Sequence, residues 1–330
     1  GGEAALRGRT ALEIVMQPHD YRQAAEWLPK EASWALAAKV YAVIGGVIGY
    51  ATDMVDHDLP RDEADFDRWV TQRVLSSAAT LHHEATTLLA EDPTVGAFRT
   101  AIYNSILSVI ANGSVTAGKI SQRLKRPISN IDPVLKRLIS AGFVVRHADP
   151  IRDQRSTYAL ADPFLQFHYA ILEPHGSLLR ARNPREVWER RLKPIFDARV
   201  RGPVFEEQTR TWVRRFADPE TLGGEPDHVA PSSVVIDGTE HELDVVVAAD
   251  DGAAVPAART VRAIGEAKAG ETLGLGHLRR LEQARAALGT RAAHAKLLLY
   301  GPAFMPELVA AARRRGDVEL VDLERLYSGS

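Results

Sequence analysis

The chain has 330 residues, more than one ordinary hydrophobic core contains, so we expect two or three domains. Hydrophobic residues make up 45% of the chain and charged residues 25%, which is the composition of a globular protein. The net charge is −2 and cysteine is absent, which excludes a globally basic nucleic-acid binder, disulfides, zinc–cysteine sites and iron–sulfur clusters.

The longest apolar stretch covers residues 34–50. Lys39 and three glycines interrupt it, and it is too short to cross a bilayer. Alternating charges over residues 3–13 do not fit a signal peptide. We therefore expect a cytoplasmic protein that does not act at a membrane.

Residues 1–92 predict an all-helical domain. Asp20 can cap an early helix, and residues 66–90 predict one long amphipathic helix. The Asp92-Pro93 pair ends that pattern and sets the first domain boundary.

Residues 93–175 predict a winged helix-turn-helix domain, because three helices are followed by two short strands around a polar tip. The expected helices and strands cover residues 98–110, 116–124, 129–139, 143–147 and 156–160. Pro133 is expected in the first turn of the third helix, where proline is tolerated.

Basic residues gather in this region, with Asp132 as their acidic neighbour. They are Lys119, Arg123, Lys125, Arg126, Lys136, Arg137 and Arg146. A cluster of this size can neutralise several DNA phosphates, so we predict DNA contact here. The alternative is a winged helix that docks on protein, with these cations in solvent.

Residues 176–330 alternate helix and strand and predict an α/β domain with a mixed central sheet flanked by helices. The expected helices cover 187–216, with breaks at Pro194 and Gly202-Pro203, then 275–288 and 306–315. The expected strands cover 234–236, 242–247, 261–268, 296–300 and 318–321, the first two joined by a type I′ turn at Asp237-Gly238.

Three charged residues interrupt strands that are otherwise apolar: Asp244, Glu266 and Lys268. Carboxylates that converge on one point bind a hard cation such as Mg²⁺ or Mn²⁺, and a nearby lysine can orient a water or stabilise charge on a phosphate. Glu206, on the preceding helix, could add a further carboxylate. The alternative is a surface Glu–Lys pair on an edge strand with Asp244 as its neighbour.

This arrangement over residues 187–300 resembles the PD-(D/E)xK, or restriction-endonuclease-like, superfamily. The resemblance implies that Asp244 is the first-motif aspartate, that Glu266 and Lys268 form the E-x-K motif, and that Glu206 is the core-helix glutamate. Leu243 stands where the family's proline precedes the aspartate.

Four motifs appear in the order found after the ATPase core of archaeal-type ATPases, AAA-like signalling NTPases that also occur in bacteria. They lie at residues 6–9, 44–50, 161–169 and 265–268. This resemblance implies a helical lid, a winged helix and an endonuclease-like domain, from which the ATPase core is missing through truncation or shortening. Gly113 to Lys119 matches G-x-x-x-x-G-K, but it follows a helix and Ile120 replaces the metal-binding hydroxyl, so no ATP site is expected.

Two functions remain open. The first is a Mg²⁺- or Mn²⁺-dependent DNA endonuclease, the effector part of an ATPase-type protein; the second is an inactive nuclease-like module that binds DNA or protein, with a regulatory winged helix. For the first, Glu266 and Lys268 should share one strand face, with Asp244 on the adjacent strand and Glu206 approaching from the helix. Crowding should raise the pKa of at least one carboxyl unless Lys268 offsets it.

Overall fold

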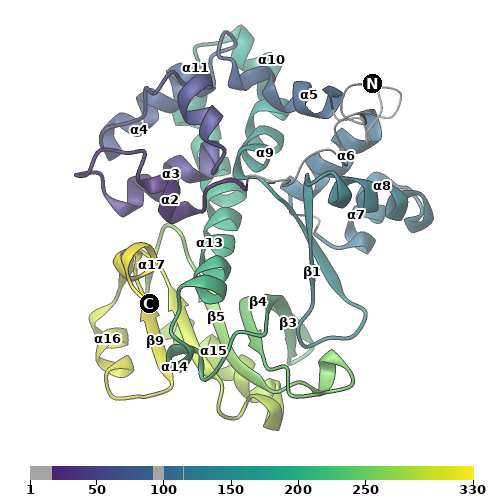
Figure 1. The fold of residues 1–330 in the computed structure, drawn as a ribbon, viewed down its shortest axis with the longest axis vertical. Helices are drawn as coiled ribbons and strands as arrows, with labels where there is room; N and C mark the ends of the chain where they lie inside the picture. The colour runs from purple at the N-terminus through teal and green to yellow at the C-terminus, as the bar shows by residue number, and fades with distance from the viewer. Residues whose placement is uncertain (1–16, 92–99, 114) are drawn as a thin grey trace, which may run out of the picture.

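The computed structural model describes residues 17–91, 100–113 and 115–330, which form three regions (Figure 1). Helices fill the top of the view, a small helical unit with a long hairpin lies at the right, and a sheet with its helices lies at the bottom. The motif at residues 6–9, the charges over 3–13 and the break at Asp92-Pro93 lie outside the described residues, as do Phe98 and Ser114 of the stretches discussed above.

The first region is helical, as predicted. Its elements are α2 (Tyr21–Ala25), α3 (Trp34–Ile44), the π-helical turn η1 (Tyr50–Met54), α4 (Glu63–Trp69), the π-helical turn η2 (Val70–Val74) and α5 (Leu81–Glu91). Asp20 caps α2, because its side chain accepts the backbone N–H groups of Arg22 and Gln23.

The single long helix expected over residues 66–90 is wrong. The chain leaves the helix after Val74 and re-enters it at Leu81. Ser76 lies within the break. Its hydroxyl accepts the N–H of Ala78 at 3.4 Å, and this local hydrogen bond competes with helical hydrogen bonding.

The second region has the predicted order of three helices and a hairpin. It contains α6 (Thr100–Ala111), α7 (Ala117–Leu124), α8 (Ile128–Ser140), β1 (Val144–Ala148) and β2 (Ser156–Leu160), with β1 and β2 antiparallel. Helix α8 starts earlier than expected, so Pro133 lies inside the helix and not in its first turn.

A long helical segment connects this region to the sheet. It comprises α9 (Pro163–Phe167), η4 (His168–Leu172), α10 (Glu173–Ala181), α11 (Pro184–Val187), η5 (Trp188–Leu192), α12 (Lys193–Phe196), η6 (Asp197–Arg201) and α13 (Gly202–Arg215).

The breaks expected at Pro194 and Gly202-Pro203 do not occur, because each proline follows a wide π-helical turn. Lys193 and Gly202, which precede the two prolines, donate their N–H groups to carbonyls five residues back. The wider turn makes room for a ring that would clash with the carbonyl of a regular helix. Pro174 follows η4 in the same way. The helical path breaks at Arg182 and Asn183 and is then unbroken from Pro184 to Arg215.

The third region contains the mixed five-stranded sheet that the sequence predicts. Its strands are β3 (His228–Ile236), β4 (Thr239–Ala248), β5 (Val261–Ala267), β7 (Lys296–Tyr300) and β9 (Val318–Val321), in the order β3-β4-β5-β7-β9. The first two pairs are antiparallel and the last two are parallel. Asp237 and Gly238 have φ of 49° and 79°, as the predicted type I′ turn requires.

Shorter elements complete this region. They are α14 (Pro219–Leu222), η7 (Pro256–Ala258), β6 (Thr272–Leu273), α15 (Leu275–Ala287), η8 (Gly289–Ala292), β8 (Ala303–Phe304), α16 (Pro306–Ala312) and α17 (Leu323–Ser328). The predicted helices over 275–288 and 306–315 correspond to α15 and α16, whereas β6, β8 and α17 were not predicted.

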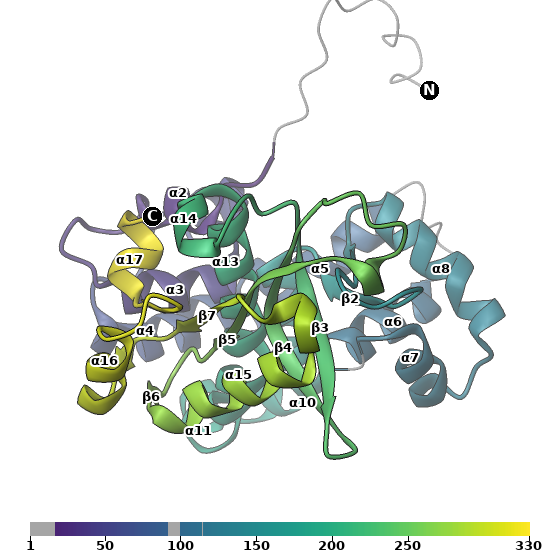
Figure 2. The same ribbon diagram turned by 90° about the horizontal axis from the view of Figure 1, so that it is seen from below.

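Helices cover both faces of the sheet. Val245 and Ala263 pack on the side of α13, in the core that also holds Trp212. Val246 packs on the opposite side with Leu281 of α15, which lies in front of the strands when the molecule is seen from below (Figure 2).

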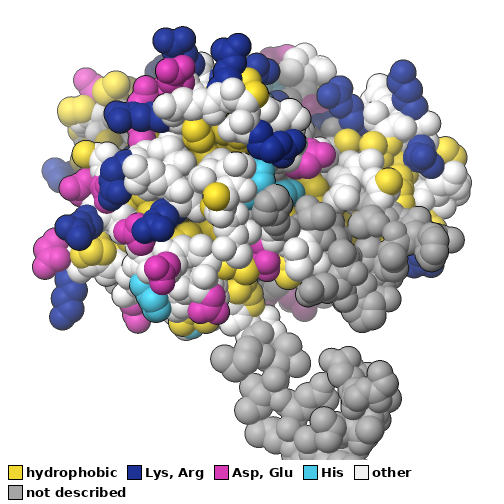
Figure 3. Space-filling view, turned by 90° about the horizontal axis from the view of Figure 1, so that it is seen from above, with side chains coloured by type: hydrophobic (Ala, Val, Ile, Leu, Met, Phe, Trp, Pro, Cys, Tyr) yellow, Lys and Arg dark blue, Asp and Glu magenta, His cyan; other side chains and the backbone are white. Residues whose placement is uncertain are grey.

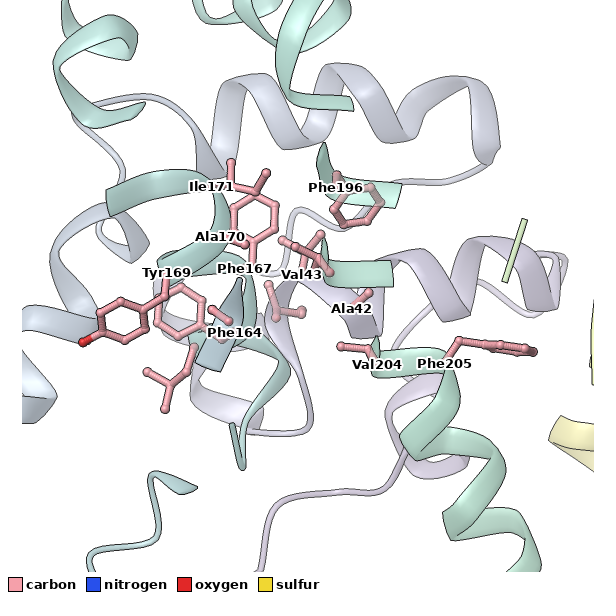
Figure 4. Packing of buried hydrophobic residues seen from close by; sticks show 14 of the residues in the cluster. Ala42, Val43, Phe164, Phe167, Tyr169, Ala170, Ile171, Phe196, Val204 and Phe205 are labelled. Carbon is pink, nitrogen blue, oxygen red and sulfur yellow. The ribbon is translucent and has the colours of Figure 1, made fainter. Parts of the chain in front are cut away.

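The larger core runs through all three regions. Around its centre, Val43 of α3, Phe164 and Phe167 of α9, Phe196 of α12 and Val204 of α13 lie close together (Figure 4). Across the described parts of the chain, no helix is long and apolar enough to cross a membrane.

Candidate functional site

A β-bulge lies at Asp244, inside the β3–β4 pairing and just before the β4–β5 pairing begins. The register pairs Ala230 with Val246 but Ser232 with Leu243, so Asp244 and Val245 together lie opposite Pro231. Proline has no N–H for the ladder, and strands commonly irregularise where it occurs. Bulges redirect side chains, and here the extra residue brings the Asp244 carboxyl toward β5.

The Asp244 side chain is bound to the neighbouring strand. Its Oδ2 accepts the N–H of Ala267 at 2.8 Å, and the β4–β5 pairing begins one residue later, with Val245 opposite Gly265. Asp244 therefore lies beside β5 at the start of this pairing, and the expectation that it shares one face with Glu266 stays a prediction. Burial raises the pKa of Asp244 even though the Ala267 N–H stabilises its charged form.

Glu266 is held by two cations. Its Oε1 lies 3.1 Å from Lys268 Nζ and 2.8 Å from Arg280 Nη2 of α15. The expectation that Lys268 belongs to the strand is wrong by one residue, because β5 ends at Ala267 and the Lys268 N–H bonds to the Tyr300 carbonyl. Burial lowers the pKa of Lys268, but Asp244 and Glu266 outweigh that effect and raise it.

Glu206 approaches from α13, as expected. Burial, and after it the charge of Asp244, raises the pKa of Glu206 to about 8. Both carboxyls therefore have the raised pKa that crowding was expected to produce, although loss of water contributes more than repulsion does.

A buried arginine organises this end of α13. Arg210 is 4% exposed, and it donates to Glu207 Oε2 and to the Asp244 carbonyl, each at 2.8 Å. Glu207 in turn binds Arg214 at 2.8 Å. The spacings of three and four residues between Glu206, Glu207 and Arg210 could have indicated these pairs from the sequence. No sequence spacing indicates the pair of Arg280 with Glu266, because the two residues lie 14 positions apart in different elements.

The described residues contain no group of three His, Asp or Glu side chains arranged to hold a metal ion. Asp244 and Glu206 fit a hard cation in their chemistry, since both are oxygen donors and each destabilises the charge of the other. Glu266 does not join them while Lys268 and Arg280 hold it. Its role as a metal ligand stays a prediction.

Most of the predicted DNA-binding cations are exposed. Lys119 and Arg123 on α7 and Lys125 and Arg126 after it make no ion pair with other described residues. The remaining cations have partners: Lys136 binds Asp132 at 2.8 Å, Arg137 donates to Tyr103 Oη at 3.4 Å, and Arg146 donates to Ser156 Oγ at 2.9 Å. Positive and negative side chains intermingle over the face shown in Figure 3, so no field of one sign covers it.

The tip of the β1–β2 hairpin is bound to the sheet. Asp149, 4% exposed, accepts from Ser232 Oγ with both of its oxygens, at 2.7 and 2.9 Å. Arg152 and Arg155 bind Glu240 of β4 at 3.2 and 2.7 Å. The tip arginines are therefore engaged with protein.

A cavity of about 560 Å³ lies between this hairpin and α13. Glu206 and Asp244 line one part of it, and Lys119 of α7 lines another. The cavity thus joins the candidate carboxylates to the basic helical unit.

No protein-family profile matches this chain. The chain is 24% identical over 183 residues to the uncharacterized protein MJECL04 of Methanocaldococcus jannaschii, covering 54% of this chain and 38% of that protein. It thus spans about two fifths of that curated relative's length. Among solved structures it is similar to protein VC1899 from Vibrio cholerae, with 14% identity, a TM-score of 0.26 and coverage of 79% of this chain and 51% of that one. Neither similarity is close enough to assign the chain to a family.

Proposed function

We propose that this protein hydrolyses phosphodiester bonds of DNA with Mg²⁺ or Mn²⁺. The observation that carries the proposal is the convergence of Asp244, Glu206, Glu266 and Lys268 from one helix and two neighbouring strands. These side chains are partly buried, where ionisable groups are costly unless they are paired or bind a cation, and active sites collect groups with perturbed pKa values.

Asp244 and Glu206 would hold the metal, and Glu266 would join them after leaving Arg280. When bound, the metal supplies a polarised phosphoryl oxygen and a water of lowered pKa. Hydrolysis forms a bond from the water oxygen to phosphorus and breaks the bond from phosphorus to a deoxyribose oxygen. As a ligand, Glu206 would be ionised, so the proton of the water would pass to solvent and a proton from solvent would complete the leaving oxygen, while Lys268 would stabilise negative charge on the phosphate.

Two parts of the molecule would carry out this reaction. We propose that α6, α7 and α8 with the β1–β2 hairpin form a winged helix-turn-helix that holds DNA through the exposed cations of α7. We propose that residues 176–330 form a PD-(D/E)xK-like nuclease domain, supported by its mixed sheet with α13 and α15 on opposite faces. The order of the four sequence motifs supports a cytoplasmic ATPase core as a partner.

Cleavage of circular DNA tests the proposal. Single-stranded circles and supercoiled plasmid are incubated with Mn²⁺ and with wild type, Asp244→Asn or Asp53→Asn, the same change at an exposed aspartate outside the site. Asn keeps an acceptor for the Ala267 N–H but loses the charge, so we expect cleavage to fall at least about 100-fold, while Asp53→Asn keeps activity. Equal cleavage by wild type and Asp244→Asn would show that the activity is a contaminant.

One observation favours a second function. Glu266 is neutralised by Lys268 and Arg280, which suits a module that binds nucleic acid or protein without cutting it. Titration calorimetry with Mn²⁺ separates the two functions. DNA binding without metal binding would favour the binding module.

A further inference from the structure

The cavity beside the candidate carboxylates is built from both strands of the hairpin. Val145 and His147 of β1 line it, as do Ala159 and Thr157 of β2, to which they are directly paired. Paired residues share a face, so one whole face of the hairpin points into the cavity. The opposite wall is α13, which runs beside β1 (Figure 1).

One polar atom in the hairpin wall lacks a partner. Thr157 Oγ1 is buried and makes no hydrogen bond with the described residues. A buried polar group without a partner is unfavourable, so this atom points to a polar ligand.

The two parts of the cavity carry opposite charge. Lys119 makes no ion pair with the described residues, and Arg199 Nη1 donates to the carbonyl of Asn112 at 3.1 Å. Both cations are therefore available to a phosphate. Glu206 and Asp244 stand at the other part, where a cation-assisted reaction would take place.

The volume excludes a double helix. A sphere of 560 Å³ is about 10 Å across, narrower than the major groove of B-DNA alone, which is about 12 Å wide. A pocket of this size fits ligands of the drug or nucleotide class. A duplex cannot enter a cavity of this width, whereas one strand that is separated from its partner can.

We propose that the cavity takes an unpaired strand of DNA, so that the substrate at the carboxylates is single-stranded. The inference rests on the proposed function, because it names the substrate class of the same site. Lys119 and Arg199 hold a backbone phosphate at the entrance, and Thr157 bonds to the sugar or base inside. The strand then reaches Asp244 and Glu206 between the hairpin and α13.

Binding measurements without divalent metal test the inference independently of hydrolysis. A fluorescent oligothymidylate and a blunt duplex are titrated with wild type, with Ala159→Trp, which fills the cavity, and with Ala148→Trp, which adds the same bulk to an exposed site on the same hairpin. Ala159→Trp should lose about tenfold in single-strand affinity while its duplex affinity stays within about twofold. Ala148→Trp should bind both as wild type does.

A second pair of variants avoids any packing change. Lys119→Ala should weaken single-strand binding about tenfold, whereas Lys30→Ala, at an exposed lysine outside the cavity, should leave it unchanged. Wild-type single-strand affinity in Lys119→Ala, or in a folded Ala159→Trp, would overturn the inference. Equal competition by thymidine monophosphate and by the oligonucleotide would also overturn it. If single strands bind as expected but are not cleaved in Mn²⁺, the proposed hydrolysis is contradicted while the single-strand binding site is supported.

Discussion

At the scale of single residues, the carboxylates of the site differ in how strongly neighbouring cations stabilise their charge. The charge of Asp244 raises the pKa of Glu206, while Arg210 and Lys268 lower the pKa of both carboxyls. Burial outweighs these cations, so both groups have a raised pKa. Glu266, on the neighbouring strand β5, forms ion pairs with Lys268 and Arg280. Arg280 therefore competes with any metal for Glu266.

Removing Arg280 should strengthen metal binding. We expect Arg280→Ala to bind Mn²⁺ several-fold more tightly, because Glu266 is then free to turn toward Asp244. Arg279→Ala is the matched control, since Arg279 is also exposed on α15 but does not contact Glu266. Calorimetric titration measures both variants, and unchanged affinity in Arg280→Ala would exclude Glu266 as a ligand.

Glu206 makes metal binding depend on pH. Its pKa is raised from 4.5 to about 8, so the metal-free protein holds a proton there at pH 7 and must release it when a cation binds. Apparent Mn²⁺ affinity should therefore rise as pH increases from about 5 to about 8 and level off above that. Titrations at pH 7 in two buffers of different ionisation enthalpy report the released proton, which Glu206→Gln should abolish. Proton release that persists in that variant would assign it to another group.

At the scale of elements, the β1–β2 hairpin joins two regions. Its tip is fastened to β3 and β4 through Asp149, Arg152 and Arg155, and one of its faces lines the cavity. The hairpin therefore has less freedom to contact DNA than the exposed helix α7 has. DNA contact by this unit should depend on the cations of α7 and the residues that follow it.

Replacing Arg123, Lys125 and Arg126 with Ala should weaken duplex binding and flatten its salt dependence. Each lost phosphate contact reduces the slope of log affinity against log salt by about 0.9, so the triple variant should lose up to about 3. Fluorescence anisotropy over a range of salt concentrations measures the slope. Arg152→Ala is the control, because Arg152 is bound to Glu240. A slope equal to that of wild type would remove α7 from the DNA interface.

At the scale of the whole molecule, one hydrophobic core connects the helical regions with the face of the sheet that packs on α13. Phe167, fully buried, lies in this core between α3 and α12 (Figure 4). The same core includes Trp212 of α13. We therefore expect the three regions to unfold together.

Phe167→Ala should lower the free energy of unfolding by about 3–5 kcal/mol, the usual cost of emptying a buried aromatic site. Ile48→Ala, at a side chain that is 53% exposed, should change it by less than about 0.5 kcal/mol. Urea unfolding followed by tryptophan fluorescence and by circular dichroism should give coincident transitions in both variants. Two separate transitions, with only one shifted by Phe167→Ala, would show independent domains.

The sequence alone determined the local features of this protein, because they depend on neighbours in the chain. Apolar periodicity predicted most helices, alternation and the Asp237-Gly238 turn predicted the hairpin of the sheet, and the interrupted strands singled out Asp244 and Glu266. The tertiary structure alone decided what remote residues do to one another. Only the fold brings Arg280 to Glu266 and fastens the hairpin tip to the sheet, and only the fold buries Glu206 near Asp244, which raises the pKa of Glu206. The unbroken path through the prolines was also beyond local rules, because a π-helical turn is stabilised by packing that the sequence pattern does not contain.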